Sequence, residues 1–341
     1  MRYTEKYLSD LYSIRHAVPQ VQKLQGKKIL ISGAGGLICS ALVDALLSWD
    51  MNIQVFATGR NVEKLRKRFC FWEKTDNLKI IQWDVSEPLD ISENIDFLIH
   101  GAAYANPVAY GTKPVETMLS NFLGTENMLR YVCRQGFGRA MYISSSEVYG
   151  TKPDNTAYGE SDYGVVDILD PRSCYPSSKR AAETLCASYH KEYGVDVVIV
   201  RPGHVYGPTA APEDNRASSQ FPRDVLLGKN IVMKSSGSQL RSYCYVLDCV
   251  SAMLTVLIGG NSGRAYNISN KNSVVTIRQM AEAFASAAGR QVVFEDPTHA
   301  EAAAFNKMSH SDLDAAALEG LGWQAMFDLE TGVEATLDSM N

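Results

Sequence analysis

The chain has 341 residues, enough for one large domain or two closely joined domains with a substantial core. Its formal net charge is −5 and it contains no long basic block, so the composition does not indicate nucleic-acid binding. Its seven cysteines lack the spacing of metal ligands and its apolar runs are too short to cross a bilayer, which argues against a structural metal and a membrane protein. Unpaired thiols favour a reducing compartment, and we expect a cytoplasmic protein.

Residues 1–26 form an extension before the first predicted strand. It has early charges and no uninterrupted apolar core, so we expect no secretory signal. Apolar side chains recur there at roughly helical spacing, at Tyr3, Tyr7, Leu8, Leu11 and Tyr12. The pattern predicts a short docking helix, with a subunit contact as one place where it could dock.

Short apolar, β-branched runs then alternate with helical patterns as far as Arg201. The runs cover residues 28–32, 53–57, 79–83, 97–100, 140–144 and 197–200. Strands that are apolar along their length and followed by helices predict an α/β fold, a Rossmann-type doubly wound parallel sheet with ligands at the carboxyl ends of its strands. Beyond Arg201 the alternation fades. We therefore predict a dinucleotide-binding domain over 27–201 and a smaller, partly interleaved substrate-binding α/β region over 202–341.

A glycine-rich turn, ISGAGGLICSALVDALL, joins the first predicted strand to a predicted helix. Gly33 and Gly36 fit two of the three places of a GxxGxxG pattern, and Cys39 stands at the third. Such a turn lets the backbone approach a pyrophosphate at a helix N-terminus, where amides and the dipole favour anions. The turn indicates nucleotide binding, with Leu37 and Ile38 as further contacts; a plain tight turn is the alternative.

The second predicted strand ends VFATGRN, without the acidic residue that usually binds a ribose 2′-hydroxyl. Arg60 could instead face a 2′-phosphate, so these residues leave both NAD and NADP open. Asp84 ends the third predicted strand, where it is placed to meet an adenine amino group. A helix N-cap is the competing role for Asp84.

Tyr175 and Lys179 are four residues apart in DPRSCYPSSKRAAETL, which places both on one face of a helix. An enzyme that oxidises an alcohol with a nicotinamide needs a base near neutrality beside a hydroxyl that positions the substrate oxygen. Tyrosine, with a pKa of about 10, reaches neutrality if about 4 kcal/mol favours its phenolate, which a lysine ammonium and a cationic cofactor ring can supply. We therefore predict Tyr175 as the base, Lys179 as the group that acidifies it, and Ser145 as the positioning hydroxyl.

Glu147 follows Ser145 by two residues in YISSSEVYG. Simple hydride transfer does not need this carboxylate. It therefore suggests chemistry at a neighbouring carbon, such as proton transfer or stabilisation of an enolate. An exposed loop carboxylate or a helix cap is the alternative.

Several segments resemble extended short-chain dehydrogenase/reductases that act on nucleotide sugars, the NAD-dependent epimerase/dehydratase family. Within it the chain most resembles the UDP-glucuronate decarboxylase (UDP-xylose synthase) branch. The resemblance rests on residues 84–89, 105–129, 144–150, 171–185, 215–221 and 238–248. YxxxK and the glycine turn occur throughout the superfamily, whereas the RSCY and RSYCYV segments are more specific.

The resemblance implies a triad of Ser145, Tyr175 and Lys179, with Ser146 and Glu147 in a later step. It also implies a homodimer and a tightly held, recycled NAD. A TGR segment after the second strand occurs in NAD-using members, so Arg60 is not good evidence for NADP. Implied cofactor contacts are Val85, Ala102, Ala103, Asn121 and Pro202. Implied contacts with a nucleoside-diphosphate sugar, a UDP-sugar being favoured, are Tyr104, His204, Arg216, Gln220 and Arg241. The guanidinium groups suit the diphosphate.

The leading hypothesis is a lyase that forms a transient 4-keto sugar, so that a carboxylate on carbon 5 becomes a β-keto acid and leaves as carbon dioxide. The chain departs from the branch at several places: Pro176-Ser177-Ser178 replaces an acidic tripeptide, Gly203, His204 and Thr209 are changed, Cys39 replaces a glycine, and GAAYANP replaces HLACPASP. A 4,6-dehydratase and a 4-epimerase therefore stay open, as does a non-catalytic nucleotide sensor. Dehydratases of the dTDP-glucose type have Asp where Ser146 stands, which argues against that variant.

Overall fold

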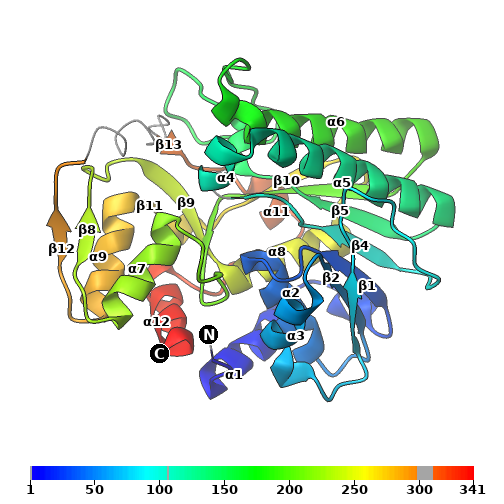
Figure 1. The fold of residues 1–341 in the computed structure, drawn as a ribbon, viewed down its shortest axis with the longest axis horizontal. Helices are drawn as coiled ribbons and strands as arrows, with labels where there is room; N and C mark the ends of the chain where they lie inside the picture. Colours follow the sequence, from blue (N-terminus) through cyan, green and yellow to red (C-terminus); the bar gives the residue numbers. More distant parts are fainter. Residues whose placement is uncertain (1, 106, 298–309) are drawn as a thin grey trace.

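The computed structural model describes residues 2–105, 107–297 and 310–341. Its larger lobe is built on a parallel seven-stranded sheet in the order β10-β6-β5-β4-β1-β2-β3 (Figure 1). The strands are β1 (Lys28–Ser32), β2 (Gln54–Gly59), β3 (Leu78–Gln82), β4 (Phe97–His100), β5 (Arg139–Ile143), β6 (Val197–Pro202) and β10 (Ala265–Ile268). The six predicted runs are β1 to β6, which confirms the Rossmann-type fold. β10 comes from the C-terminal region and pairs with β6, so the two regions interleave.

Alternate residues of the strands face two separate layers of core. Ile29 and Ile31 pack with α2 and α8, whereas Leu30 packs with α5 and α6 on the opposite face (Figure 1). The helices of this lobe are α2 (Leu37–Ser48), α3 (Val62–Arg68), α4 (Pro107–Thr112), α5 (Pro114–Gln135), α6 (Cys174–Tyr193), α8 (Val246–Gly259) and α11 (Ala316–Glu319). Burial on both faces explains why the central strands are mostly apolar, whereas the edge strand β3 exposes Lys79 and Gln82.

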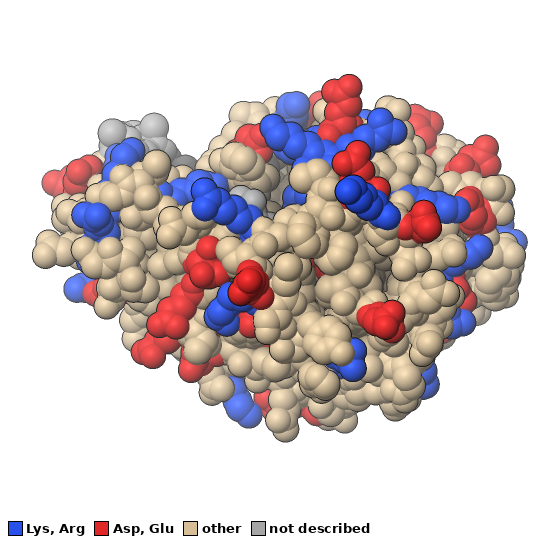
Figure 2. Space-filling model, turned by 90° about the horizontal axis from the view of Figure 1, so that it is seen from below, with Lys and Arg blue, Asp and Glu red and all other residues tan. Residues whose placement is uncertain are grey.

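The smaller lobe carries two small sheets, and the chain crosses repeatedly between the lobes. One sheet has the order β11-β9-β13 with β7 also paired to β9, and β12 pairs with β8. The strands and helices of the smaller lobe are β7 (His204–Tyr206), α7 (Ala217–Leu226), β8 (Ile231–Met233), β9 (Leu240–Tyr245), β11 (Val274–Thr276), α9 (Ile277–Ala287), β12 (Val292–Phe294), β13 (His310–Ser311) and α12 (Leu329–Met340). In the described part of the chain, no helix is long and apolar enough to cross a membrane. Basic and acidic side chains are interspersed on the face shown in Figure 2.

The predicted N-terminal helix forms as α1 (Glu5–Ser13) and docks on the chain itself. Its anchor is Asp44 on α2, which is fully buried and forms an ion pair with Arg68 at 2.5 Å. Tyr3 Oη and Tyr7 Oη donate to the same carboxylate at 2.7 and 3.0 Å, and Trp72 Nε1 donates at 2.9 Å. The extension also contacts α12, through Arg2 N and Ser339 O at 2.7 Å. It therefore joins both lobes (Figure 1).

Replacing Asp44 by alanine is expected to destabilise the protein by about 3 kcal/mol, because the change leaves the Arg68 charge, the buried Tyr7 hydroxyl and the partly buried Tyr3 hydroxyl without their acceptor. Urea unfolding measures the effect. The matched control is Glu282→Ala, which removes an exposed ion pair with Arg278 and is expected to cost less than about 0.5 kcal/mol. An equal, small loss in both variants would contradict this role of Asp44.

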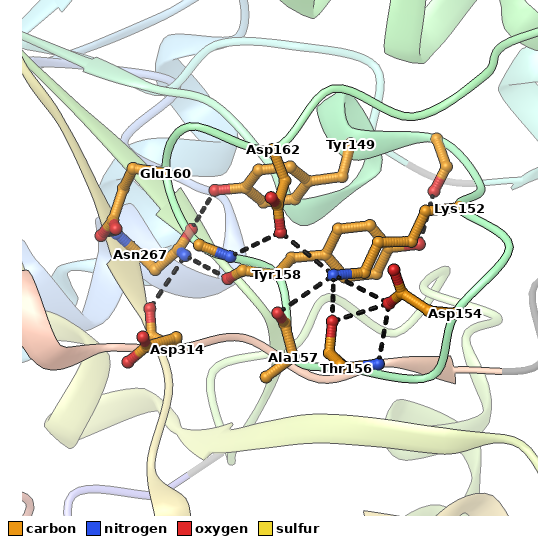
Figure 3. A network of polar contacts seen from close by, with 12 residues as sticks. Tyr149, Lys152, Asp154, Thr156, Ala157, Tyr158, Glu160, Asp162, Asn267 and Asp314 are labelled. Carbon is orange, nitrogen blue, oxygen red and sulfur yellow. Dashed lines mark hydrogen bonds and ion pairs between the residues drawn. The ribbon is translucent and has the colours of Figure 1, made fainter.

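A buried polar network fixes the loop that links β5 to α6 (Figure 3). Asn267 on β10 donates to Tyr158 O and Asp314 O at 2.8 and 2.9 Å, and accepts a hydrogen bond from Tyr149 Oη at 2.6 Å. At the other end of the network, Lys152 Nζ forms an ion pair with Asp162 at 3.1 Å. Ser145 and Glu147 lie at the start of this loop and Tyr175 follows its end, so the network fixes the chain between them.

Candidate active site

A cavity of about 1140 Å³ lies at the carboxyl ends of the strands, where the two lobes meet. Its walls come from the β1–α2 turn, the ends of β2 and β5, the N-terminus of α6, and the loops that enter β7 and α7. The cavity brings together most residues predicted from the sequence: Gly33, Gly36, Leu37, Ile38, Arg60, Asp84, Val85, Ala102, Ala103, Tyr104, Ser145, Ser146, Glu147, Tyr175, Lys179, Pro202, His204, Arg216 and Arg241.

Two predicted contacts, Asn121 and Gln220, do not line this cavity. Asn121 is buried where α5 packs on α6, and its Nδ2 donates to Ser178 Oγ at 2.9 Å. Gln220 is exposed on α7, and its Nε2 donates to Asp224 at 2.8 Å. Neither residue therefore lines the cavity, and their direct contacts with cofactor and substrate stay predictions. Asn121 instead supports the helix that carries Tyr175.

The glycine turn provides a backbone cradle at the start of α2. Gly33 has φ +67°, and a Cβ there would lie 2.7 Å from the Cα of Ala102. Gly36 is the N-cap residue of α2, so the first amides of that helix face the cavity region. A side chain at Gly33 would collide with the backbone after β4, so glycine keeps this turn tight, which fits the close approach of a dinucleotide pyrophosphate.

Cys39 and Gly101 explain two departures from the family pattern. Cys39 is buried, and a Cβ added at Gly101 would lie only 2.4 Å from its Sγ. The space that a glycine on α2 would leave is filled by the Cys39 thiol, and Gly101 after β4 makes room for it. Thr209, at a third changed position, donates from Oγ1 to Leu37 O at 2.7 Å and ties the smaller lobe to the first turn of α2.

Tyr175 and Lys179 lie on one face of α6 with their side chains close together, as predicted. Lys179 Nζ lies 5.6 Å from the centre of the Tyr175 ring and donates to Ile143 O at 2.7 Å. Burial lowers the pKa of Lys179 to about 7. Burial, with the charge of Glu147, raises the pKa of Tyr175 to about 12, although a hydrogen bond with Ser145 opposes this rise. Desolvation of the phenolate therefore outweighs the charges of the protein's own groups, and the lowered pKa that we expect also needs the positive charge of the bound cofactor ring.

The buried ammonium of Lys179 predicts a pH dependence of stability. Its folded pKa lies below the ordinary value of about 10.4, so between about pH 7 and 10 the unfolded chain binds a proton that the folded chain does not. Stability is therefore expected to rise with pH in this window, by up to about 4 kcal/mol from this group. Lys179→Met should lose that contribution in urea unfolding at several pH values. A stability difference from the native chain that stays constant with pH would contradict the assignment.

Glu147 forms an ion pair that the sequence did not reveal. Arg172 Nη1 and Nη2 donate to its two carboxylate oxygens at 2.8 and 3.3 Å. The same guanidinium lies 5.3 Å from the centre of the Tyr110 ring, and Tyr110 stacks on Tyr175 at 4.6 Å. Arg172 precedes Tyr175 by three residues, a helical spacing that could have identified it. Tyr110 gave no such signal, because only the fold brings α4 to α6.

Cationic and neutral polar groups from the smaller lobe complete the cavity. Arg216, before α7, pairs with Asp214 at 2.5 Å, and Arg241 on β9 is buried. Burial and nearby arginines lower the pKa of His204 to about 3, so this ring is neutral at physiological pH. It lies 5.7 Å from the ring of Tyr243. This side of the cavity is therefore suited to a polar, anionic ligand.

Comparisons with known proteins agree with this geometry. The chain is 38% identical over 259 residues to UDP-glucuronic acid decarboxylase 3 of Arabidopsis thaliana, covering 75% of this chain and 72% of that protein. It is 34% identical over 318 residues to UDP-glucuronic acid decarboxylase 1 of Xenopus tropicalis, covering 91% and 71%. The predicted resemblance to this branch is confirmed.

Solved structures share the fold at lower identity. A UDP-glucuronic acid 4-epimerase from Bacillus cereus, in complex with UDP-glucuronic acid and NAD, matches with a TM-score of 0.77 at 24% identity, over 92% of this chain and 98% of that one. A dTDP-glucose 4,6-dehydratase from Bacillus anthracis in complex with NAD matches with a TM-score of 0.75 at 19% identity, over 92% and 96%. The family model that describes the NAD dependent epimerase/dehydratase family matches residues 29–269. The chain belongs to the NAD dependent epimerase/dehydratase family.

Proposed function

We propose that the protein is a nucleotide-sugar lyase that decarboxylates a UDP-uronate, UDP-glucuronate above all, through a transient 4-keto sugar. One observation carries this proposal: a hydroxyl, a phenol, an ammonium and an ion-paired carboxylate meet in one cavity beside a dinucleotide cradle. The named relatives, all UDP-glucuronic acid decarboxylases, support the choice of substrate.

The residues of the cavity fit NAD. Gly33, Gly36 and Ala102 would hold the pyrophosphate side, and Tyr175 and Lys179 would lie at the reactive end. When bound, NAD supplies the acceptor and later the donor of a hydride, and a positive charge that favours the Tyr175 phenolate.

The first chemical task falls to Tyr175 and Ser145. Ser145 Oγ orients the hydroxyl on carbon 4 of the sugar, and Tyr175 accepts its proton as that carbon is oxidised to a ketone. Lys179 stabilises the phenolate form of Tyr175, which accepts that proton and becomes a phenol, from one turn away on α6. The raised pKa keeps Tyr175 protonated while no cofactor charge lies beside it, so it releases its own proton to solvent before it acts as the base.

Loss of carbon dioxide follows from the ketone. The bond between carbon 5 and the carboxylate breaks, and its electron pair forms an enolate across carbons 4 and 5. Ser146 and Glu147 orient the ring and assist proton return to carbon 5. Arg172 holds the Glu147 carboxylate in one orientation with two hydrogen bonds. Reduction of the ketone then restores the carbon 4 hydroxyl.

The test is mass spectrometry of the purified protein after incubation with separate UDP-, dTDP-, GDP- and CDP-sugars, including uronates. Decarboxylation predicts loss of carbon dioxide from UDP-glucuronate with no net change of the cofactor. Loss of water from a hexose instead would assign a dehydratase, and a product of unchanged mass an epimerase. Failure to release carbon dioxide from any uronate would overturn the proposal.

A homodimer formed through α5 is also part of the proposal. Apolar side chains are exposed along one stripe of this helix, at Val115, Met118, Leu119, Phe122 and Leu123. The spacing of three and four residues makes one continuous face that suits a second copy of the same helix. Light scattering of the native chain and of Phe122→Glu checks this, with a dimer expected for the first and a monomer for the second.

The cytoplasm is the proposed location of the protein. Its free cysteines support this location, because unpaired thiols favour a reducing compartment.

A further inference from the structure

The N-terminal extension, residues 2–26, packs between the two lobes without entering the cavity. Its helix α1 contacts α2 of the larger lobe and α12 of the smaller lobe (Figure 1). Of the described residues, none before Gly33 lines the cavity. The extension also precedes residues 29–269, which the family model matches. It can therefore act on the cavity only through the elements on which it packs.

On the larger lobe, the extension is anchored to α2. Tyr7 and Leu11 are the two fully buried side chains of α1. Tyr7 donates to Asp44 in the middle of α2, and Leu11 O accepts a hydrogen bond at 2.8 Å from Nε1 of Trp49, the C-cap residue of that helix. The opposite end of α2 begins at the glycine turn and lines the cavity. The extension therefore holds a helix whose N-terminus forms part of the dinucleotide cradle.

On the smaller lobe, the extension is anchored to α12. Thr4 Oγ1, at the N-cap of α1, donates to Asp338 on α12 at 2.7 Å. The helix α12 packs in turn on α7 and β9. Its Gly332 lies so close to Tyr206 Oη on β7 that a side chain there would collide with the phenol. Both β7 and β9 line the cavity on the side predicted to hold the sugar nucleotide, so a shift of α12 would move this wall.

We infer that the N-terminal extension clamps the smaller lobe against the larger one and thereby sets the affinity of the cavity for the nucleoside-diphosphate sugar. A ligand that contacts both walls binds only when their separation is right, so its apparent affinity falls with the fraction of molecules in that arrangement. Arg216 and Arg241 would contact this ligand from the smaller lobe. The dinucleotide cradle at Gly33 and Ala102 belongs to the larger lobe alone, so NAD binding should not depend on the clamp. The inference rests on the proposed function for the identity of the sugar nucleotide.

Hydrogen exchange of the full chain tests the clamp without any ligand. Tyr7→Ala combined with Leu11→Ala removes both buried side chains of α1, and Leu11→Ala alone is the milder variant. Relative to β4 and β5, exchange in α12, β9 and α7 should be about tenfold faster in the double variant and about threefold faster in Leu11→Ala. The matched control is Leu129→Ala, an equally buried leucine of α5 outside the cavity, which should not accelerate these elements selectively.

Isothermal titration calorimetry then measures the affinities of the full chain, freed of co-purified dinucleotide, for UDP and separately for NAD. The double variant should bind UDP about tenfold more weakly than the native chain, and Leu11→Ala about threefold more weakly. Both variants should bind NAD within about twofold of the native affinity. Leu129→Ala should match the native chain for both ligands. Circular dichroism confirms that each variant folds, and Leu11→Ala decides the matter if the double variant does not.

Native exchange rates in β9 and α7 of the variants would overturn the inference, and so would native affinity for UDP despite faster exchange. Equal losses of UDP and NAD binding, or the same loss in Leu129→Ala, would overturn it as well, because general destabilisation would then account for the effect. A native chain that bound no UDP would refute the substrate class of the proposed function. The exchange rates would still decide whether the extension clamps the lobes.

Discussion

Replacing Tyr175 by phenylalanine is expected to lower kcat by at least about a thousandfold, because the variant keeps the ring and loses the group that accepts the substrate proton. Tyr175 is buried and stacked on Tyr110, a packing that phenylalanine preserves. The melting temperature and the dinucleotide affinity should therefore stay close to those of the native chain. Steady-state release of carbon dioxide measures the first quantity, and calorimetry measures the other two.

Tyr189→Phe is the matched control for Tyr175→Phe. Tyr189 lies on the same helix and donates to Glu126 at 3.2 Å, outside the cavity. Its loss should leave kcat within about twofold of the native value, as expected of a surface hydroxyl. A Tyr175→Phe chain that kept a tenth or more of native turnover would show that another group takes the proton.

The second large effect is expected at Glu147. Glu147→Gln should lower carbon dioxide release by about a hundredfold or more, because the amide cannot carry a proton and cannot form the charged pair with Arg172. Its effect on Tyr175 has the opposite sign. The charge of Glu147 is one cause of the raised pKa of Tyr175, so its removal favours the phenolate and the first oxidation. The variant should therefore accumulate ketone relative to decarboxylated product.

Trapping with borodeuteride during a single turnover separates the two steps in the Glu147 variant. Ketone should form a larger share of the trapped sugar than in the native chain. Glu126→Gln, which removes a carboxylate paired with Arg130 outside the cavity, provides the control and should match the native chain. Native ratios of ketone to product in Glu147→Gln would leave Glu147 without a role in the later step.

The parts of the site set by local spacing could be predicted from the sequence. The glycine turn follows β1 directly, and Tyr175 and Lys179 are one helical turn apart, so neither depends on distant contacts. The parallel sheet could be predicted for the same reason, because six of its strands are short, mostly apolar runs. The strand β10 could not, since only tertiary pairing with β6 places residues 265–268 in the main sheet.

What the sequence missed depends on packing between distant segments. Tyr110 and Tyr175 are 65 positions apart and meet only because α4 folds over the start of α6. Burial raises the pKa of Tyr175, and the types and spacing of the residues do not reveal how deeply a side chain is buried. Asn121 lies on the face of α5 that packs against α6, and spacing alone could not distinguish that face from the one toward the cavity. The close contact between Cys39 and Gly101 could not be predicted either, because it depends on the tertiary structure.

Borodeuteride quenching of the native enzyme during a single turnover of UDP-glucuronate tests most directly whether carbon 4 is oxidised to a ketone beside Tyr175 and Ser145. The mechanism predicts deuterium attached to carbon 4 of the trapped sugar at early times, and its disappearance as the decarboxylated product completes. Release of carbon dioxide with no deuterium ever trapped at carbon 4 would contradict it.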